Sequence, residues 1–249
     1  MSIASEIERI KTNIMRAYTK LNEKGATMPS TQNSNNLTNT IDSITAGSGD
    51  NIFDYFSESI QNESEDAMYL ILSSIKKIPN IDISNVVSGQ FLFTRFSGIT
   101  EIPNMDFNNI INADYMFSEC TNLQTLNNIN ISNALSAQAC FNNDENLKSI
   151  NNINISSIVS EKSYEEWDSP VLYMFVRCSQ LETISFSGSI NVSIDFSHCT
   201  LLNHESLLGI ISVLSTTSTT KVMNFGTANL TKLTDEEKAI ATSKGWTLS

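Results

Sequence analysis

The densest group of side chains that could do chemistry is Tyr164-Glu165-Glu166-Trp167-Asp168, which places three carboxyl groups beside two aromatic rings. Paired carboxylates next to an aromatic ring are able to hydrolyse glycosidic bonds. Adjacent residues rarely converge on one bond, however, and a loop fixes the distance between two carboxyl groups poorly. Tyr164, Glu166, Trp167 and Asp168 are therefore candidate ligand-binding residues for a sugar or a protein, and the alternative is a passive loop that packs on its scaffold.

Two histidines and four cysteines complete the set of side chains that could act as catalysts or metal ligands. His198 and His204 stand outside any HExxH or GxSxG motif, and the chain has no glycine-rich phosphate loop. We therefore predict that the protein is not an enzyme and binds no metal or cofactor. The cysteines form no CxxC pair, so we expect reduced thiols that pack as small core residues: Cys120, Cys140, Cys178 and Cys199.

The charge balance limits the partners. The 27 acidic residues exceed the 15 Lys and Arg residues and give a net charge of −12, which repels phosphate backbones, so no nucleic acid is expected. The first residues carry charges at Glu6, Glu8, Arg9 and Lys11, where a secretion signal would need an apolar run. Since no apolar run long enough to cross a bilayer follows, we expect synthesis in the cytoplasm without a signal peptide or a membrane anchor.

The elements that must position these side chains form a repeat with a period of about 24 residues, a length that is common among stacked repeats. Apolar residues recur at that interval in several columns, a pattern that is typical of coils that each bury an apolar face on their neighbours. The columns are Ile75/Ile99/Leu123/Leu147, Ile78/Ile102/Leu126/Ile150, Ile81/Met105/Ile129/Ile153, Ile83/Phe107/Ile131/Ile155 and Phe93/Phe117/Phe141.

A polar column runs between the apolar ones and consists of Asn80, Asn104, Asn128 and Asn152. We predict a structural ladder in which each amide occupies an interior bend and satisfies backbone groups there. The alternative is that these residues are simply exposed turn asparagines.

The register is interrupted after Ile155. Tyr173 and Cys178 match Tyr115 and Cys120 only if ten residues are inserted, and the surplus falls in the segment from Glu161 to Pro170. This segment predicts a loop that leaves the coil, and it places Cys120 and Cys178 in equivalent inward positions.

The repeat stops after Cys199, and the last part of the chain reads as a cap for the final coil. Residues 204–214 predict a short helix, and residues 221–225 predict a strand. Thr234-Asp-Glu-Glu237 is a capping box that opens a second helix, and Gly245 follows that helix at the position where glycine ends helices.

The N-terminal residues have a third composition. An apolar stripe at alternating spacings of four and three predicts an oligomerisation helix, and isoleucine at both core positions favours a homotrimer. The alternatives are packing within the chain against Leu37, Ile41 and Ile44, or docking on another protein. The stripe consists of Ile3, Ile7, Ile10, Ile14, Ala17 and Leu21.

Three segments resemble known families. The unit ADYMFSECTNLQTLNNINISNA, residues 113–134, is similar to the BspA-like leucine-rich repeat of the Treponema pallidum type, and this resemblance covers residues 51–203. Residues 3–29 and 34–44 resemble the N-terminal module of tail-associated proteins in phages of Gram-positive bacteria. The ending LTDEEKAIATSKGWTLS, residues 233–249, is similar to the terminus of phage proteins that carry these repeats.

The resemblance implies an α+β fold with three parts. These are an N-terminal helical attachment and oligomerisation module with its linker (1–50), a leucine-rich-repeat solenoid with short strands (51–203), and a C-terminal α/β cap (204–249). It implies a structural and recognition protein in the tail or baseplate of a virion or of a phage-tail-like particle. The expected partners are other tail proteins and a bacterial surface glycan or protein. The alternatives are a BspA-like adhesin on a bacterial surface and a purely structural baseplate scaffold.

Overall fold

The computed structural model describes residue 30 and residues 72–78, 82–159 and 169–249. In these residues the chain has a mixed α/β fold with two small parallel sheets, each of three strands. Apart from residue 30, the predicted N-terminal module, with its stripe from Ile3 to Leu21, lies outside the described residues. No helix in the described part is long and apolar enough to cross a membrane.

The first sheet shows the repeat interval of the sequence directly. Thr125 pairs with Ser149, which occupies the same position one repeat later, and Ser149 pairs with Thr183, which occupies that position again once the insertion is allowed for. The pairing therefore confirms both the predicted register and the predicted insertion. The three strands are β1 (Thr125–Asn127), β2 (Ser149–Ile153) and β3 (Thr183–Phe186).

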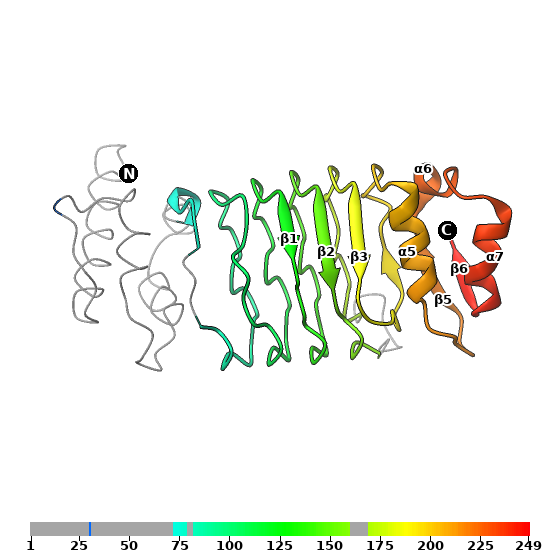
Figure 1. The fold of residues 1–249 in the computed structure, drawn as a ribbon, viewed down its shortest axis with the longest axis horizontal. Helices are drawn as coiled ribbons and strands as arrows, with labels where there is room; N and C mark the ends of the chain where they lie inside the picture. The colour runs from blue at the N-terminus through cyan, green and yellow to red at the C-terminus, as the bar shows by residue number, and fades with distance from the viewer. Residues whose placement is uncertain (1–29, 31–71, 79–81, 160–168) are drawn as a thin grey trace.

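Isolated parallel bridges extend this register beyond the sheet. Ser88 pairs with Asn112 and Asn112 with Ser136, and on another side of the turns Asn130 pairs with Asn154. Figure 1 shows the result, in which successive turns of the chain lie side by side along the long axis of the drawing. We call residues 82–159 and 169–202 the repeat region.

The core of the repeat region is a column of aromatic rings. Phe93 and Phe117 stack with their ring centroids 5.3 Å apart, and Phe117 and Phe141 stack at 5.7 Å. The column continues through Phe175 and Phe196, whose centroids lie 4.6 Å apart. The predicted apolar columns surround these rings, and their described members are buried except for Ile102, which is half-buried.

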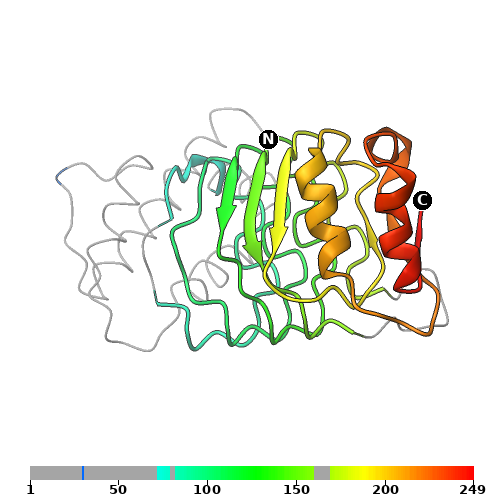
Figure 2. The same cartoon turned by 45° about the vertical axis from the view of Figure 1, so that its right-hand side comes forward.

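The C-terminal region, residues 204–249, contains three helices. Figure 2 shows α5 beside β3, where it continues the row of strands, with α7 beyond it. The two predicted helices and the strand are confirmed, and α6 and β6 were not predicted. The elements are α5 (His204–Val213), β5 (Lys221–Asn224), α6 (Gly226–Leu230), α7 (Asp235–Ser243) and β6 (Trp246–Leu248), and β5 pairs with β6 and with β4 (Ile194–Asp195) of the repeat region.

Polar side-chain contacts join the two regions. Asn229 is fully buried, and its Nδ2 donates to the carbonyl of Cys199 at 2.9 Å. Lys232 Nζ donates to the carbonyls of Thr200 and Leu202 at 2.9 and 2.7 Å. The C-terminal region thus donates hydrogen bonds to carbonyl groups of the last turn of the repeat region. Those groups would otherwise lack partners, because no further turn of the repeat follows.

Candidate functional site

The predicted ladder residues lie at the surface of the repeat region. Asn104, Asn128 and Asn152 are exposed, so the prediction of interior bends is wrong for all three, and Asn80 lies outside the described residues. Asn152 Nδ2 donates to Asn128 Oδ1 at 2.8 Å, which makes the bond between side chains and not to backbone. The exposed alternative that the sequence left open therefore describes these positions.

Asparagine suits positions 128 and 152 because of their backbone. The φ angle is 56° at Asn128 and 64° at Asn152, in the left-handed region that asparagine tolerates better than most residues. Asn127 and Asn151, one residue earlier, are partners in the sheet and repeat the arrangement, with Nδ2 of Asn151 donating to Oδ1 of Asn127 at 2.9 Å. We call Asn127, Asn128, Asn151 and Asn152 the amide row.

The amide row is an exposed, uncharged surface with spare hydrogen-bonding capacity. Each side-chain amide has two donor hydrogens and two acceptor lone pairs, and the bond along the row uses one donor of one residue and one acceptor of its neighbour. All four residues are exposed. Such a surface can bind hydroxyl groups or peptide groups and has no group that could transfer a proton at neutral pH.

Asparagines that bond to backbone occur in two other columns, which the sequence reasoning missed. Asn109 Nδ2 donates to the carbonyl of Ser84, and Asn133 Nδ2 donates to that of Asn108 at 2.7 Å. On another side of the turns, Asn122 and Asn146 donate to the carbonyls of Ser97 and Thr121. Each asparagine reaches the carbonyl 25 residues earlier, so each column fastens one turn to the preceding one. The sequence does contain a signal for these two columns, because asparagine recurs in each at the repeat interval. Each column extends over fewer turns than the column of Asn104, Asn128 and Asn152, on which the prediction was based.

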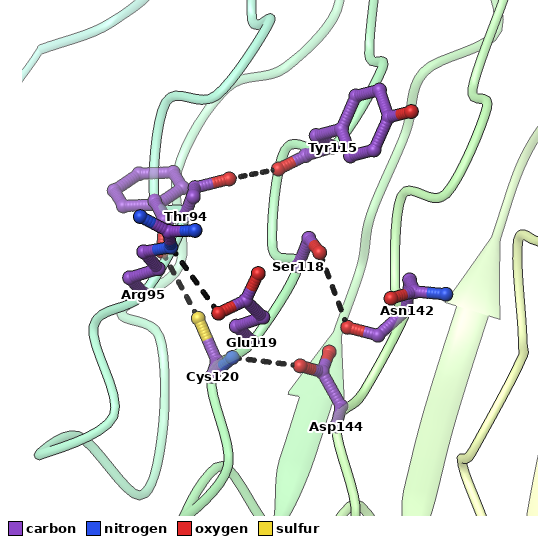
Figure 3. Close-up of polar contacts among 9 residues, drawn as sticks. Thr94, Arg95, Tyr115, Ser118, Glu119, Cys120, Asn142 and Asp144 are labelled. Carbon is purple, nitrogen blue, oxygen red and sulfur yellow. Dashed lines mark hydrogen bonds and ion pairs between the residues drawn. The ribbon is translucent and has the colours of Figure 1, made fainter. Parts of the chain in front are cut away.

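A buried carboxyl group lies inside the repeat region. Asp144 occupies the column position of Cys120, one period later, and is fully buried. Its Oδ1 accepts a hydrogen bond from the backbone N–H of Cys120 at 2.8 Å, and its Oδ2 has no partner among the described residues. Figure 3 shows the carboxyl pointing toward Cys120, with Glu119 and Ser118 on the adjacent turn.

Burial sets the ionisation of this group. Desolvation raises the pKa of Asp144 well above its usual range, the Cys120 amide opposes that shift, and the nearby Glu119 carboxylate adds to it. Asp144 sits in a place where a neutral side chain would be favoured. Since a carboxylate here lacks a countercharge, the group destabilises the fold when it ionises.

The four cysteines are free and buried, which confirms the expected packing role. Cys120 Sγ donates to the carbonyl of Phe93 at 3.0 Å, and Cys178 Sγ donates to that of Phe141 at 2.9 Å, so these two thiols are equivalent as predicted. Desolvation raises the pKa of every one of the four thiols, which keeps them neutral. Among the described residues, no three His, Cys, Asp or Glu side chains are grouped so that they could hold a metal ion.

The remaining candidates are distributed as follows. His204 begins α5, and its Nε2 lies 2.9 Å from Glu237 Oε1 of α7, while His198 is exposed in a turn. Arg95 and Glu119 form an ion pair across adjacent turns at 3.2 Å. The predicted ligand-binding residues Tyr164, Glu166, Trp167 and Asp168 lie outside the described residues.

Comparisons with known proteins identify no similar protein. No protein-family profile matches the chain, and neither the curated proteins nor the solved structures give a match. The functional argument therefore depends on the residues themselves.

Proposed function

We propose that the chain is a leucine-rich-repeat solenoid that acts as a structural and recognition protein in a phage tail, a baseplate or a phage-tail-like particle. The observation that carries the proposal is the parallel pairing of successive turns at the repeat interval, with an aromatic column inside. Stacked turns of this kind make long, rigid surfaces, which suit attachment and scaffolding. The particle assignment rests on the resemblance of residues 3–29, 34–44 and 233–249 to phage tail proteins.

The amide row is the proposed contact surface for a bacterial glycan or protein. Its four side chains are exposed and neutral in a chain of net charge −12, so a ligand rich in hydroxyl groups can approach them without charge repulsion. Their ordered spacing follows from the strand pairing, which holds the amides in place before any ligand binds. A preorganised row loses little side-chain entropy on binding.

Binding to cell walls tests this proposal. The purified chain is mixed with walls of Gram-positive bacteria, either intact or stripped of their glycopolymers, and the bound fraction is measured by sedimentation. We expect binding to intact walls and at least a tenfold weaker association for the variant carrying both Asn127→Ala and Asn151→Ala. A variant with Gln90→Ala and Gln180→Ala, which removes two exposed amides outside the columns of the amide row, should bind as the natural chain does.

A second variant tests the predicted loop residues separately. Tyr164→Ala with Trp167→Ala removes two aromatic rings that could stack on a sugar. Reduced wall binding with an unchanged melting temperature would add the loop to the contact surface. If the natural chain fails to bind any wall preparation, the recognition role is wrong and the scaffold role in the particle becomes the better proposal.

Assembly through the N-terminal stripe forms part of the same proposal. Replacing Ile7 and Ile14 by Glu puts charges at core positions of the heptad pattern, which a coiled coil does not accept. Light scattering should show a trimer for the natural chain and a smaller species for this variant. An unchanged mass would contradict assembly through these residues.

A further inference from the structure

Four exposed aliphatic residues recur along the repeat region at the repeat interval. They are Val87, Ile111, Leu135 and Val159, and between 41% and 63% of each residue is exposed. Large apolar residues scattered singly on a surface are ordinary, but a column of them at the repeat interval forms a continuous apolar line. The other exposed columns described above consist of polar residues.

Backbone pairing between successive turns sets the spacing of the first three residues of this line. Ile111 N–H donates to the Val87 carbonyl and Leu135 N–H to the Ile111 carbonyl, both at 2.8 Å. Parallel bridges lie one residue further along each turn, from Ser88 to Asn112 and from Asn112 to Ser136. The side chains of Val87, Ile111 and Leu135 therefore follow one another at about 4.8 Å, the spacing of paired strands.

The described residues around the line carry almost no charge. We call residues 84–91, 108–115, 132–139 and 156–159 the lateral strip. Twenty-one of its residues are exposed or half-buried, and Asp114 is the one charged residue among them. Charged residues make up 17% of the whole chain, which would correspond to three or four in a set of this size.

Asp114 is also tied into the repeat. Its carboxylate accepts hydrogen bonds from the backbone N–H of Gln138, at 2.8 Å, and from the hydroxyl of Ser136. At the edge of the strip, Phe91 and Tyr115 stack with centroids 5.1 Å apart. Depletion of charge together with aromatic rings is the composition of the buried centre of protein interfaces.

We propose that the lateral strip is the surface through which a second copy of this chain packs alongside the first. Two chains of net charge −12 repel each other over most of their surfaces, and the strip is a face on which that repulsion is weak. A second copy presents the same line of side chains at the same spacing, so the two lines match along their length. Twenty-one accessible residues fall within the roughly 20–30 residues that each partner contributes to an interface of standard size.

The test separates this contact from assembly through the N-terminal stripe. Sedimentation velocity is run on full-length chains at total concentrations from about 1 to about 500 µM. The first chain carries Ile7→Glu and Ile14→Glu, and the second carries Ile111→Glu and Leu135→Glu in addition. We expect concentration-dependent dimers for the first chain and at least a tenfold weaker association for the second, because four carboxylates would face one another across each pair of strips.

A control carries the same added charge elsewhere. Asn104→Glu and Gln124→Glu, in the background of the first chain, change two exposed residues outside the strip and should leave the association unchanged. The milder Leu135→Asn keeps the strip uncharged and should weaken association by a smaller factor, while circular dichroism reports on the fold of each variant. A first chain that remains monomeric at every concentration overturns the proposal, and so does equal association of the strip variants and the control.

Discussion

The repeat region and the C-terminal region satisfy their polar groups in different ways. In the repeat region the partner of a side chain lies about one period away in sequence, as in the bond from Asn133 to the carbonyl of Asn108. In the C-terminal region many partners are local, as in the capping box of α7, where Thr234 and Glu237 bond to each other's backbone N–H groups. The repeat region therefore depends on neighbouring turns for its order, whereas α7 supplies its own start signal.

The two regions also place different residue types at positions where the backbone is left-handed. The C-terminal region uses glycine, at Gly226 with φ 70° and Gly245 with φ 89°. The repeat region places ten other residues there, and they fall into the columns Phe91/Tyr115/Ala139/Tyr173, Arg95/Glu119/Asn143/Arg177 and Asn128/Asn152. A side chain with Cβ costs about 1 to 2 kcal/mol in this conformation, so the repeat region retains side chains at a cost that glycine would avoid. Several of these side chains contact their counterparts on the next turn, as Arg95 contacts Glu119.

The largest expected effect comes from cutting the aromatic column. Phe117→Ala should lower the free energy of unfolding by about 3 to 5 kcal/mol, because Phe117 stacks on a ring above and a ring below. Urea unfolding followed by circular dichroism measures the change. Leu233→Ala, in the C-terminal region, should cost less, and a larger loss for Leu233 than for Phe117 would show that the column does not dominate stability.

Two carboxyl groups should respond to pH in opposite directions. Asp144→Asn should raise the free energy of unfolding at pH 7 by about 1 to 3 kcal/mol, because it removes a buried group that ionises without a countercharge. The pKa of Asp144 is raised by burial, so its stabilising contribution is complete below about pH 4 and is lost as the pH rises toward the folded pKa. The advantage of Asn should therefore grow from about pH 4 upward.

Glu237 provides the contrast in the C-terminal region. The Thr234 amide and then His204 lower its pKa, so its contribution is present above the unfolded pKa and is lost as the pH falls through the folded one. Melting temperatures between pH 3 and pH 8 compare Asp144→Asn with Glu237→Gln. The first variant should gain over the natural chain as the pH rises, and the second should lose over the same interval. Parallel curves for the two variants would contradict the assigned environments.

The smallest expected effects come from two substitutions at positions with a left-handed backbone, one that replaces glycine by a larger residue and one that replaces a larger residue by glycine. Gly226→Ala should destabilise the protein by about 1 to 2 kcal/mol, since its new Cβ would lie 3.1 Å from the Ser197 Cα at φ 70°. Arg177→Gly should stabilise it by about 0.5 kcal/mol, because relief of strain exceeds the added entropy of the unfolded chain. Thermal melting checks both. A loss on Arg177→Gly would mean that this side chain contributes more than its backbone conformation costs.

The sequence predicts the repeat interval well because the same positions are buried in every turn and are therefore apolar at a regular spacing. Ile99, Leu123 and Leu147 are apolar at every turn since the same interior surface recurs, and the structure buries all three. The ten-residue insertion was visible for the same reason, because Cys178 resumes the column of Cys120. The capping box was predictable because its two side chains are three residues apart and bond locally.

The polar columns were less predictable. The amide of Asn128 and that of Asn133 recur at the same interval, but one is exposed and bonds to a side chain, whereas the other fastens a turn to its neighbour. Recurrence alone does not show on which side of the backbone a polar side chain lies. Asp144 was missed because a single carboxyl in an apolar column leaves no periodic mark. The lateral strip was missed because its defining property is that charged residues are almost absent from it.

The aromatic column does not stop at the end of the repeats. Phe196 is followed by Phe225, which belongs to the C-terminal region and lies 6.3 Å away, centroid to centroid. The C-terminal region contains three helices, whose contacts are local and form quickly, whereas each turn of the repeat must close a loop of about 24 residues before it gains a neighbour. Folding should then nucleate at the C-terminal helices and spread toward the N-terminus one turn at a time, with Phe225 as the first ring of the stack. Since a ribosome makes residues 204–249 after the repeat region, the repeats of a nascent chain should remain without their template until these residues have emerged.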